Sequence, residues 1–318
     1  MYKLMVLTRA YDNKILSLQR QGRTATFAPG FGEEAAQVGS ASAMRPNDIF
    51  VPAFRQSGVY LTRGFPMDLY LLYWIGYEEG NVVPENVRGM PMAVPVSTQM
   101  PHAAGIAYAQ KYKGSDSAVV AYVGDGGTSE GDFAEALNLA GVWKAPLVAI
   151  IQNNQWAISM PRKKQSAAET LAQKAFAAGI NGVQVDGNDV VAVYKATREA
   201  ISNARDGPTL IECVTYRMGM HTTSDDPTKY RSDEETAAWA KKDPILRVKA
   251  YLEGKGLLSD AIDKEIEEGN SKIIDSWVEK AESFKPDPTS MFTNVYSFMP
   301  EILSAELEES KASDFWQG

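Results

Sequence analysis

The sequence has little of what several common classes of protein require. Cys213 is the only cysteine among 318 residues, so no internal disulfide is possible and a reducing compartment is permitted. The formal net charge is −8 and no long basic run occurs, which argues against nucleic acid as the main partner. No apolar run approaches the length of a transmembrane helix. We therefore expect a cytoplasmic protein that binds neither nucleic acid nor membrane.

Familiar nucleotide-binding motifs and histidines are scarce as well. Neither GxxxxGK nor GxGxxG opens a helix after a strand, which disfavours the nucleotide-binding folds that depend on those loops. Histidine occurs only twice. His102 lies on a predicted helix of small residues, where we expect it to pack or to cap. His221 lies in a polar loop, where a single histidine is most often only solvated, so any functional role for it needs separate support.

The pattern that is present predicts an α/β fold. A hydrophobic content of 44% is sufficient for a substantial core. Strands alternate with helices through the middle of the chain, which favours a mostly parallel sheet with helices on both faces. The expected strands lie at 49–54, 118–123, 147–151, 183–185 and 209–216, and the expected helices at 4–20, 33–44, 68–74, 101–113, 166–178 and 190–204. We predict an α/β domain at 1–235 and a helical C-terminal extension at 236–318.

One stretch, residues 117–161, organises the rest of the chain. An apolar, β-branched run at 118–123 stops at Gly-Asp-Gly-Gly, which contains Asp125, and a second run at 147–151 ends just before Asn154. A helix is expected between the two runs. Because ligands bind outside the carboxyl ends of parallel strands, we expect Asp125 and Asn154 to face the same crevice.

A small cation together with a phosphorylated ligand fits this crevice best. Magnesium prefers oxygen ligands and is often shared between a protein carboxylate and the phosphates of a ligand. Asp125 supplies a carboxylate, Asn154 an amide oxygen, and the backbone carbonyl near Trp156 a third ligand. The alternative is a tight turn in which Asp125 only caps the following helix. That alternative does not explain the Asn-Asn pair at the end of the next strand.

The turn after the first strand is also suited to phosphate. Its glycines let backbone N–H groups approach a phosphate closely, and the N-terminus of the following helix favours an anion. Thr128 and Ser129 supply hydroxyls that we expect to cap that helix.

The chain resembles a known family at these residues. GDG, followed after a helix and a strand by NN, is the thiamine diphosphate and magnesium motif, and it implies the thiamine diphosphate-binding fold. The sequence is most similar to the alpha subunit of the decarboxylating component of 2-oxoacid dehydrogenase complexes, of the branched-chain or pyruvate type. The resemblance covers nearly the whole chain, in blocks that follow family order and spacing: RQGR, GEEAAQVGSASAM, PAFRQSGV, GDGGTSEGDFAEALN, QNNQWAIS, ETLAQKAFAAGI, GPTLIE and HTTSDDPTKYRS.

The resemblance also assigns roles to individual residues. It implies magnesium ligands at Asp125, Asn154 and the Trp156 carbonyl. It implies a cofactor site that contains Phe54, Arg55, Val96, Gly124, Gly126, Gly127, Glu130 and His221, with His221 also acting as the catalytic residue near the substrate. Thr98 and Gln99 match ligands of a monovalent cation in some relatives.

Two positions depart from the family pattern. Phe54 stands where the family usually has a tyrosine, and Gln152 stands where the branched-chain type has an arginine that binds diphosphate. A less cationic diphosphate site follows, in which Arg55 and His221 contribute more.

We expect three residues to order the His221 loop: Arg217, Tyr230 and Arg231. Asp225 and Asp226 either pair with those arginines or belong to an ordinary acidic loop.

The implied function is that of one subunit of an enzyme. It would decarboxylate a branched-chain 2-oxoacid on thiamine diphosphate and transfer the acyl group to the lipoyl group of an acyltransferase component. Pyruvate and acetoin dehydrogenase alpha subunits are alternatives. A non-catalytic assembly subunit is disfavoured because Asp125, Asn154, Arg55 and His221 occur together. We find no second α/β unit to hold the pyrimidine, so the resemblance implies a beta subunit that supplies the activating glutamate in a heterotetramer of two alpha and two beta chains.

Overall fold

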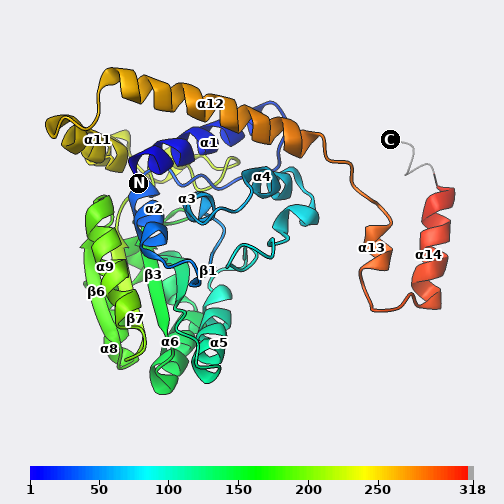
Figure 1. The fold of residues 1–318 in the computed structure, drawn as a ribbon, viewed down its shortest axis with the longest axis horizontal. Coiled ribbons are helices and arrows are strands. Elements are labelled where there is room, and N and C mark those ends of the chain that lie inside the picture. Colours follow the sequence, from blue (N-terminus) through cyan, green and yellow to red (C-terminus); the bar gives the residue numbers. More distant parts are fainter. Residues whose placement is uncertain (314–318) are drawn as a thin grey trace. The chain divides into compact units, whose positions relative to one another are not determined.

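Five strands form one parallel sheet in the computed structural model, which describes residues 1–313 (Figure 1). The strands pair in the order β1-β2-β3-β7-β6. Their bounds are β1 (Ile49–Val51), β2 (Val119–Gly124), β3 (Leu147–Asn153), β6 (Asn181–Asp186) and β7 (Thr209–Val214). Gly124 at the end of β2 is in register with Gln152 on β3, so both strands end at the same edge of the sheet. A separate antiparallel pair follows β3: β4 (Trp156–Ala157) and β5 (Met160–Pro161).

Side chains along the central strands alternate between two apolar cores. Tyr122 and Ile150 belong to one core, whereas Val123 and Ile151 belong to the other. Strands buried on both faces need apolar side chains at nearly every position, which explains the continuous apolar runs in the sequence. The first core contains residues of α1 (Tyr2–Arg20), α2 (Glu34–Ala43), α3 (Ser57–Thr62), α4 (Met67–Ile75) and α9 (Val190–Ser202). The second contains residues of α5 (Gln99–Tyr112), α6 (Gly131–Trp143) and α8 (Lys174–Ala177).

The predicted α/β class, with a parallel sheet and helices on both faces, is therefore confirmed. The C-terminal region is helical, as expected: α10 (Asp233–Ala240), α11 (Pro244–Gly254), α12 (Asp260–Glu282), α13 (Ser290–Thr293) and α14 (Glu301–Ala312). The chain divides into a compact unit Met1–Ala281 and a second unit from Glu282 onward. The division at residue 235 stays a prediction. Among residues 1–313, no helix has the length and apolar character needed to cross a membrane.

The helix expected at 166–178 is wrong. Short elements stand in this region instead: α7 (Arg162–Gln165), the 3-10 turn η3 (Leu171–Gln173) and α8. The Arg162 guanidinium donates to the carbonyls of Ala168 and Glu169. These bonds fix residues between the two short helices in a non-helical conformation, so tertiary contacts override a helix-favouring composition.

The expected caps of α6 are also wrong. Residues Gly126–Ser129 form a 3-10 turn, η2, and α6 begins after Glu130 with no side-chain cap. The Thr128 hydroxyl instead donates to the Asp125 carbonyl at 2.8 Å. Two further 3-10 turns lie in loops: η1 (Glu78–Asn81) and η4 (Pro227–Lys229).

Candidate functional site

A cavity of about 240 Å³ lies at the carboxyl ends of β2 and β3. Loops from α2, β1 and α5 contribute to its wall, together with the segment that follows β7. Except for Thr98, the predicted cofactor- and metal-binding residues come together at this one cavity, although they come from distant parts of the chain. Its lining includes Phe54, Arg55, Val96, Gln99, Gly124, Asp125, Gly126, Gly127, Glu130, Asn154, Trp156 and His221. Thr98 is separate, and its hydroxyl donates to the Pro95 carbonyl at 3.0 Å.

Asp125 is buried at the end of β2 with one carboxylate oxygen unused. Its side chain is 2% exposed, and within residues 1–313 its Oδ2 has no hydrogen-bond partner. Burial, with the nearby Glu33 carboxylate adding to it, raises the pKa of Asp125 to about 7. The charge of Arg217 and backbone N–H groups oppose this rise only in part, and within residues 1–313 Asp125 forms no ion pair. A buried carboxylate in this state is costly, so the position favours a bound cation.

Asn154 and Trp156 place further oxygens near the end of β3. The Asn154 Oδ1 accepts from the Trp156 backbone N–H at 3.2 Å, and its Nδ2 donates to Glu33. The Trp156 carbonyl accepts from the Arg217 guanidinium at 3.1 Å. Amide and carbonyl oxygens each have two lone pairs, so both retain acceptor capacity for a metal.

The donor set fits a magnesium site that is completed by a ligand. It consists of one carboxylate, one amide oxygen and one backbone carbonyl, which are all hard oxygen ligands. Across the described part of the chain, no group of three acidic, histidine or cysteine side chains forms a metal site. A cation held here would therefore take its remaining ligands from phosphate or water.

The glycines of the turn allow close approach around the cavity. A Cβ on Gly127 would lie 2.5 Å from the Val123 side chain, and one on Gly126 would lie 2.9 Å from the Ala157 Cβ. A Cβ on Gly124, by contrast, would meet no atom within 4 Å and would occupy open space along the cavity wall. Two of these glycines are thus required by packing, and the third leaves room for a ligand.

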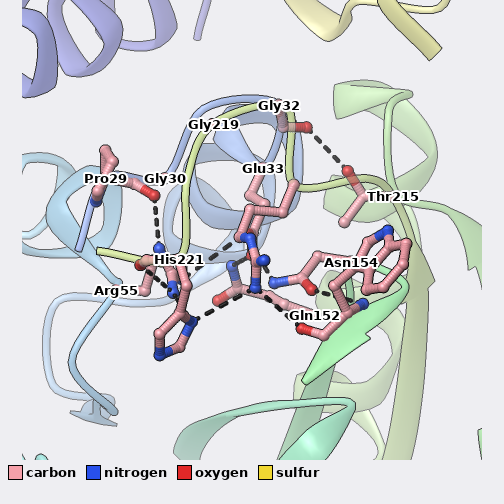
Figure 2. Close-up of polar contacts among 12 residues, drawn as sticks. Pro29, Gly30, Gly32, Glu33, Arg55, Gln152, Asn154, Thr215, Gly219 and His221 are labelled. Carbon is pink, nitrogen blue, oxygen red and sulfur yellow. Dashed lines mark hydrogen bonds and ion pairs between the residues drawn. The ribbon is translucent and has the colours of Figure 1, made fainter. Parts of the chain in front are cut away.

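Arg55 is the main cation of the cavity, and it is buried. Its guanidinium donates to the Pro29 carbonyl at 2.7 Å and to the His221 carbonyl at 2.9 Å, and its Nε lies 3.8 Å from Glu33 (Figure 2). Burial lowers the pKa of Arg55 to about 10, because the Glu33 carboxylate only partly compensates the loss of solvent. The guanidinium stays charged near neutral pH.

His221 adopts one defined tautomer. Its Nδ1 lies 3.0 Å from an Arg55 nitrogen and 3.3 Å from an Arg217 nitrogen. Guanidinium groups only donate, so Nδ1 must accept and the ring proton must reside on Nε2. Burial and the two arginines lower the pKa of His221 to about 3. The imidazole is therefore neutral at physiological pH, and its ring is also 6.0 Å from that of Phe54 in an edge-on arrangement.

The expected network does order the His221 loop. Arg217 donates to the Ile158 carbonyl at 2.7 Å and to the Tyr230 hydroxyl at 2.9 Å. Arg231 donates to three carbonyls of the same loop, those of Arg217, Met218 and Gly219.

Of the two alternatives for the loop aspartates, pairing with these arginines is not observed: within residues 1–313, neither carboxylate hydrogen-bonds to Arg217 or Arg231. Asp225 accepts from the His221 backbone N–H and from the Tyr230 hydroxyl. Asp226 caps η4 by accepting from the Thr228 backbone N–H at 3.2 Å. Both carboxylates instead satisfy N–H and O–H donors of their own loop.

Glu33 lies between these groups and was assigned no role from the sequence. Its Oε2 accepts from Gln152 at 2.7 Å and its Oε1 from Asn154 at 2.9 Å (Figure 2). Burial raises the pKa of Glu33, and Arg55 is the strongest opposing influence. The cavity thus contains two buried carboxylates, Glu33 with partners on both oxygens and Asp125 with one oxygen free.

The family described as "Dehydrogenase E1 component" matches residues 2–290 of this chain. The chain belongs to that family.

Curated relatives of this E1 chain have two different names. It is 48% identical to the pyruvate dehydrogenase E1 component subunit alpha of Acholeplasma laidlawii, over 98% of this chain and 92% of that protein. It is 46% identical to the 3-methyl-2-oxobutanoate dehydrogenase subunit alpha of Mycobacterium tuberculosis, over 98% and 86%. It is 43% identical to the pyruvate dehydrogenase subunit alpha of Staphylococcus aureus, over 98% and 85%. The predicted family and the predicted oxidoreductase class are confirmed.

Near Gln99 of this E1 chain, two buried oxygens lack partners. Ser97 has a φ of 70°, and within residues 1–313 neither its hydroxyl nor the Gln99 Oε1 makes a hydrogen bond. Both side chains line the cavity. The monovalent cation expected near Thr98 and Gln99 stays a prediction.

Sequence reasoning missed Glu33 and Gln56 of the E1 chain. Both lie in quoted motifs, GEEAAQ and PAFRQSG, yet no spacing rule connects them to the strand ends. The sequence contains one indication of a role for Glu33. A charged residue at the start of an alanine-rich, apolar helix is buried with that helix and needs hydrogen-bond or charge partners. Nothing local marked Gln56.

Proposed function

We propose that this chain is the alpha subunit of a thiamine diphosphate- and magnesium-dependent 2-oxoacid dehydrogenase that transfers an acyl group. The observation that supports this proposal most strongly is the unpartnered, buried Asp125 oxygen beside Asn154, at the edge of the sheet where ligands bind. A cation at Asp125 and an anion near Arg55 would each meet a buried group of opposite charge.

In this proposal Asp125, Asn154 and the Trp156 carbonyl hold Mg²⁺. Gly124, Gly126 and Gly127 line the diphosphate site, with Glu130 at its margin. When bound, thiamine diphosphate supplies the nucleophilic carbon and the electron sink for decarboxylation. The chain's own contribution is to bind and orient that group and to exclude water from it.

Arg55 and His221 act from the opposite wall. The Arg55 fork suits phosphate oxygens, and Phe54 contributes apolar contact, because it has no hydroxyl for a polar one. His221 presents a neutral Nε2–H, since both arginines donate to its Nδ1. That N–H donates to the substrate or to a phosphate oxygen. Val96, 51% exposed at the rim of the cavity, supports the cofactor from the side of α5.

A beta subunit completes the site in this proposal. The relatives are named as alpha subunits, which supports a beta partner, and we infer that this partner supplies the glutamate that activates the pyrimidine. We infer a heterotetramer of two alpha and two beta chains that delivers its acyl group to a lipoylated acyltransferase component in the cytoplasm.

The substrate follows from the same proposal at the level of 2-oxoacids. The names of the relatives divide between pyruvate and 3-methyl-2-oxobutanoate, so the branched-chain preference expected from the sequence stays our first choice and pyruvate the second. Acetoin cleavage is a third candidate.

A single experiment tests the function and ranks the substrates. The chain is co-expressed with its beta subunit, and thiamine diphosphate binding is measured by calorimetry with Mg²⁺ and with chelator. Turnover is then assayed on pyruvate, 3-methyl-2-oxobutanoate and acetoin. We expect metal-dependent binding and turnover of a 2-oxoacid by the complex, and none by the alpha chain alone. Turnover by the purified alpha chain would refute the shared site.

A further inference from the structure

Four buried side chains form an unbroken chain of hydrogen bonds across the floor of the cavity. The Arg55 backbone N–H donates to Gln56 Oε1 at 3.1 Å, and Gln56 Nε2 donates to Gln152 Oε1 at 2.7 Å. Gln152 Nε2 donates to Glu33, which also receives Asn154 Nδ2. The Trp156 backbone N–H ends the chain on Asn154 Oδ1. All four side chains are at most 5% exposed, so their polar groups depend on one another.

The direction of this chain is fixed at both ends. Backbone N–H groups only donate, so the amide oxygens of Gln56 and Asn154 must face outward toward them. The amide nitrogens then point inward from both sides and converge. The residue at which they meet must accept twice and donate nothing. Among side chains, only an ionised carboxylate has two acceptor oxygens and no donor, and Glu33 lies at that point.

We propose that Glu33 is a positioning residue that sets the orientation of the Asn154 amide. By accepting Nδ2, Glu33 keeps Oδ1 of Asn154, rather than the NH₂ group, beside Trp156 and available to a metal. The proposal rests on the metal site proposed above. It assigns to Glu33 a role in metal binding without contact to the metal, as partners behind a ligand commonly have.

A neutral amide at position 33 cannot fill this role in the native chain. A glutamine has one amide oxygen for the two N–H donors, from Gln152 and Asn154, that now reach different oxygens of Glu33. One of these donors would therefore face the NH₂ group of the glutamine. Gln56 cannot reverse to relieve the conflict without losing the Arg55 backbone N–H. Relief on that side needs both Gln152 and Gln56 to reverse, whereas on the other side Asn154 alone has to rotate. That rotation loses the Trp156 N–H bond of 3.2 Å and would turn Nδ2 toward the metal. The Arg55 Nε, 3.8 Å from Glu33, supplies the positive charge that makes a carboxylate tolerable here.

The direction of this chain of hydrogen bonds can be tested by moving the carboxylate from position 33 to its hydrogen-bond neighbour, position 152. In the double variant Glu33→Gln with Gln152→Glu, the new carboxylate at position 152 accepts hydrogen bonds from Gln56 Nε2 and from the new amide at position 33. That amide still accepts Asn154 Nδ2. Every donor is again matched and Asn154 keeps its orientation, although position 33 is neutral. The single variant Glu33→Gln lacks this match.

The measurement is the Mg²⁺ concentration that gives half-maximal thiamine diphosphate binding, obtained by calorimetry on the complex with the beta subunit. We expect Glu33→Gln to raise it about 10- to 100-fold, the usual effect of removing a partner behind a metal ligand. The double variant should return it close to the wild-type value. Glu34→Gln is the matched control, because Glu34 is the adjacent buried carboxylate and pairs with Arg9 outside the cavity. It should lower the thermal midpoint without changing the Mg²⁺ requirement.

Two results would overturn the inference. One is an unchanged Mg²⁺ requirement in Glu33→Gln. The other is a double variant as defective as the single one, which would show that charge at position 33 matters and amide orientation does not. If the single variant does not fold, the double variant decides, because recovery of folding and of metal binding supports the inference and failure of both refutes it. A wild-type complex that binds no thiamine diphosphate would instead refute the proposed function.

Discussion

The two walls of the cavity are built in different ways. The strand-end wall consists of Asp125 and Asn154, at the ends of the buried strands β2 and β3, and of Glu33, which is hydrogen-bonded to Asn154. The loop wall consists of Arg55 and the loop 217–232, which has little regular structure and is held by Arg217 and Arg231. The first wall derives its geometry from sheet register. The second derives it from guanidinium groups: Arg231 donates to carbonyls of its own loop, and Arg217 donates to the carbonyls of Trp156 and Ile158, which follow β3.

The walls also differ in charge. Burial raises the pKa values of Asp125 and Glu33, and each carboxylate is unfavourable for the other. Burial lowers the pKa values of Arg55 and Arg217, and the Arg217 charge lowers that of Arg55 further. A metal ion at the acidic wall and a diphosphate at the basic wall would relieve both sets of unfavourable interactions. The site is therefore electrostatically complementary to an ion pair of the kind that magnesium diphosphate presents.

The largest effect should come from the strand-end wall. We expect Asp125→Ala to abolish the Mg²⁺-dependent binding of thiamine diphosphate by the assembled complex, because it removes the only buried carboxylate with a free oxygen in the cavity lining described for residues 1–313. The fold should survive, since that oxygen has no hydrogen-bond partner among residues 1–313. Calorimetry with and without chelator measures the effect. Asp132→Ala, in the first turn of α6, is the control, and unchanged affinity in Asp125→Ala would reject the metal assignment.

A smaller and more local effect is expected at the loop wall. Arg231→Ala removes a cation that donates to three loop carbonyls. Loop opening should become easier by about 1.5–3 kcal/mol, roughly the contribution of one charge-assisted hydrogen bond. Hydrogen exchange at 217–232 should accelerate while β2 and β3 stay protected. Lys229→Ala, an exposed cation of the same loop, should change neither region. Equal acceleration in β2 would mean that the two walls are not independent.

The same difference explains what the sequence could predict. Asp125 and Asn154 were expected to converge because each ends an apolar run, and parallel strands align their carboxyl ends. The interruption of the helix expected at 166–178 was not foreseeable, since Arg162 reaches carbonyls several residues away. The role of Glu33 was equally hidden. It depends on which end of each amide faces its neighbour, and that is decided by four segments that meet only in the folded chain.

The smallest expected effect is an absence of titration at His221. Its pKa is about 3 because burial and two arginines disfavour the imidazolium, whereas an unfolded histidine titrates near 6.5. Between those values the unfolded chain therefore binds more protons than the folded chain. This group makes the free energy of unfolding rise with pH from about 3 to about 6.5, and it causes no further change above that range. The His221 ring resonances should stay constant from pH 8 to pH 5 in NMR spectra assigned with His221→Gln, and should titrate in urea. A midpoint between pH 6 and 7 in the folded complex would show that the loop wall does not hold His221 against Arg55 and Arg217 in solution.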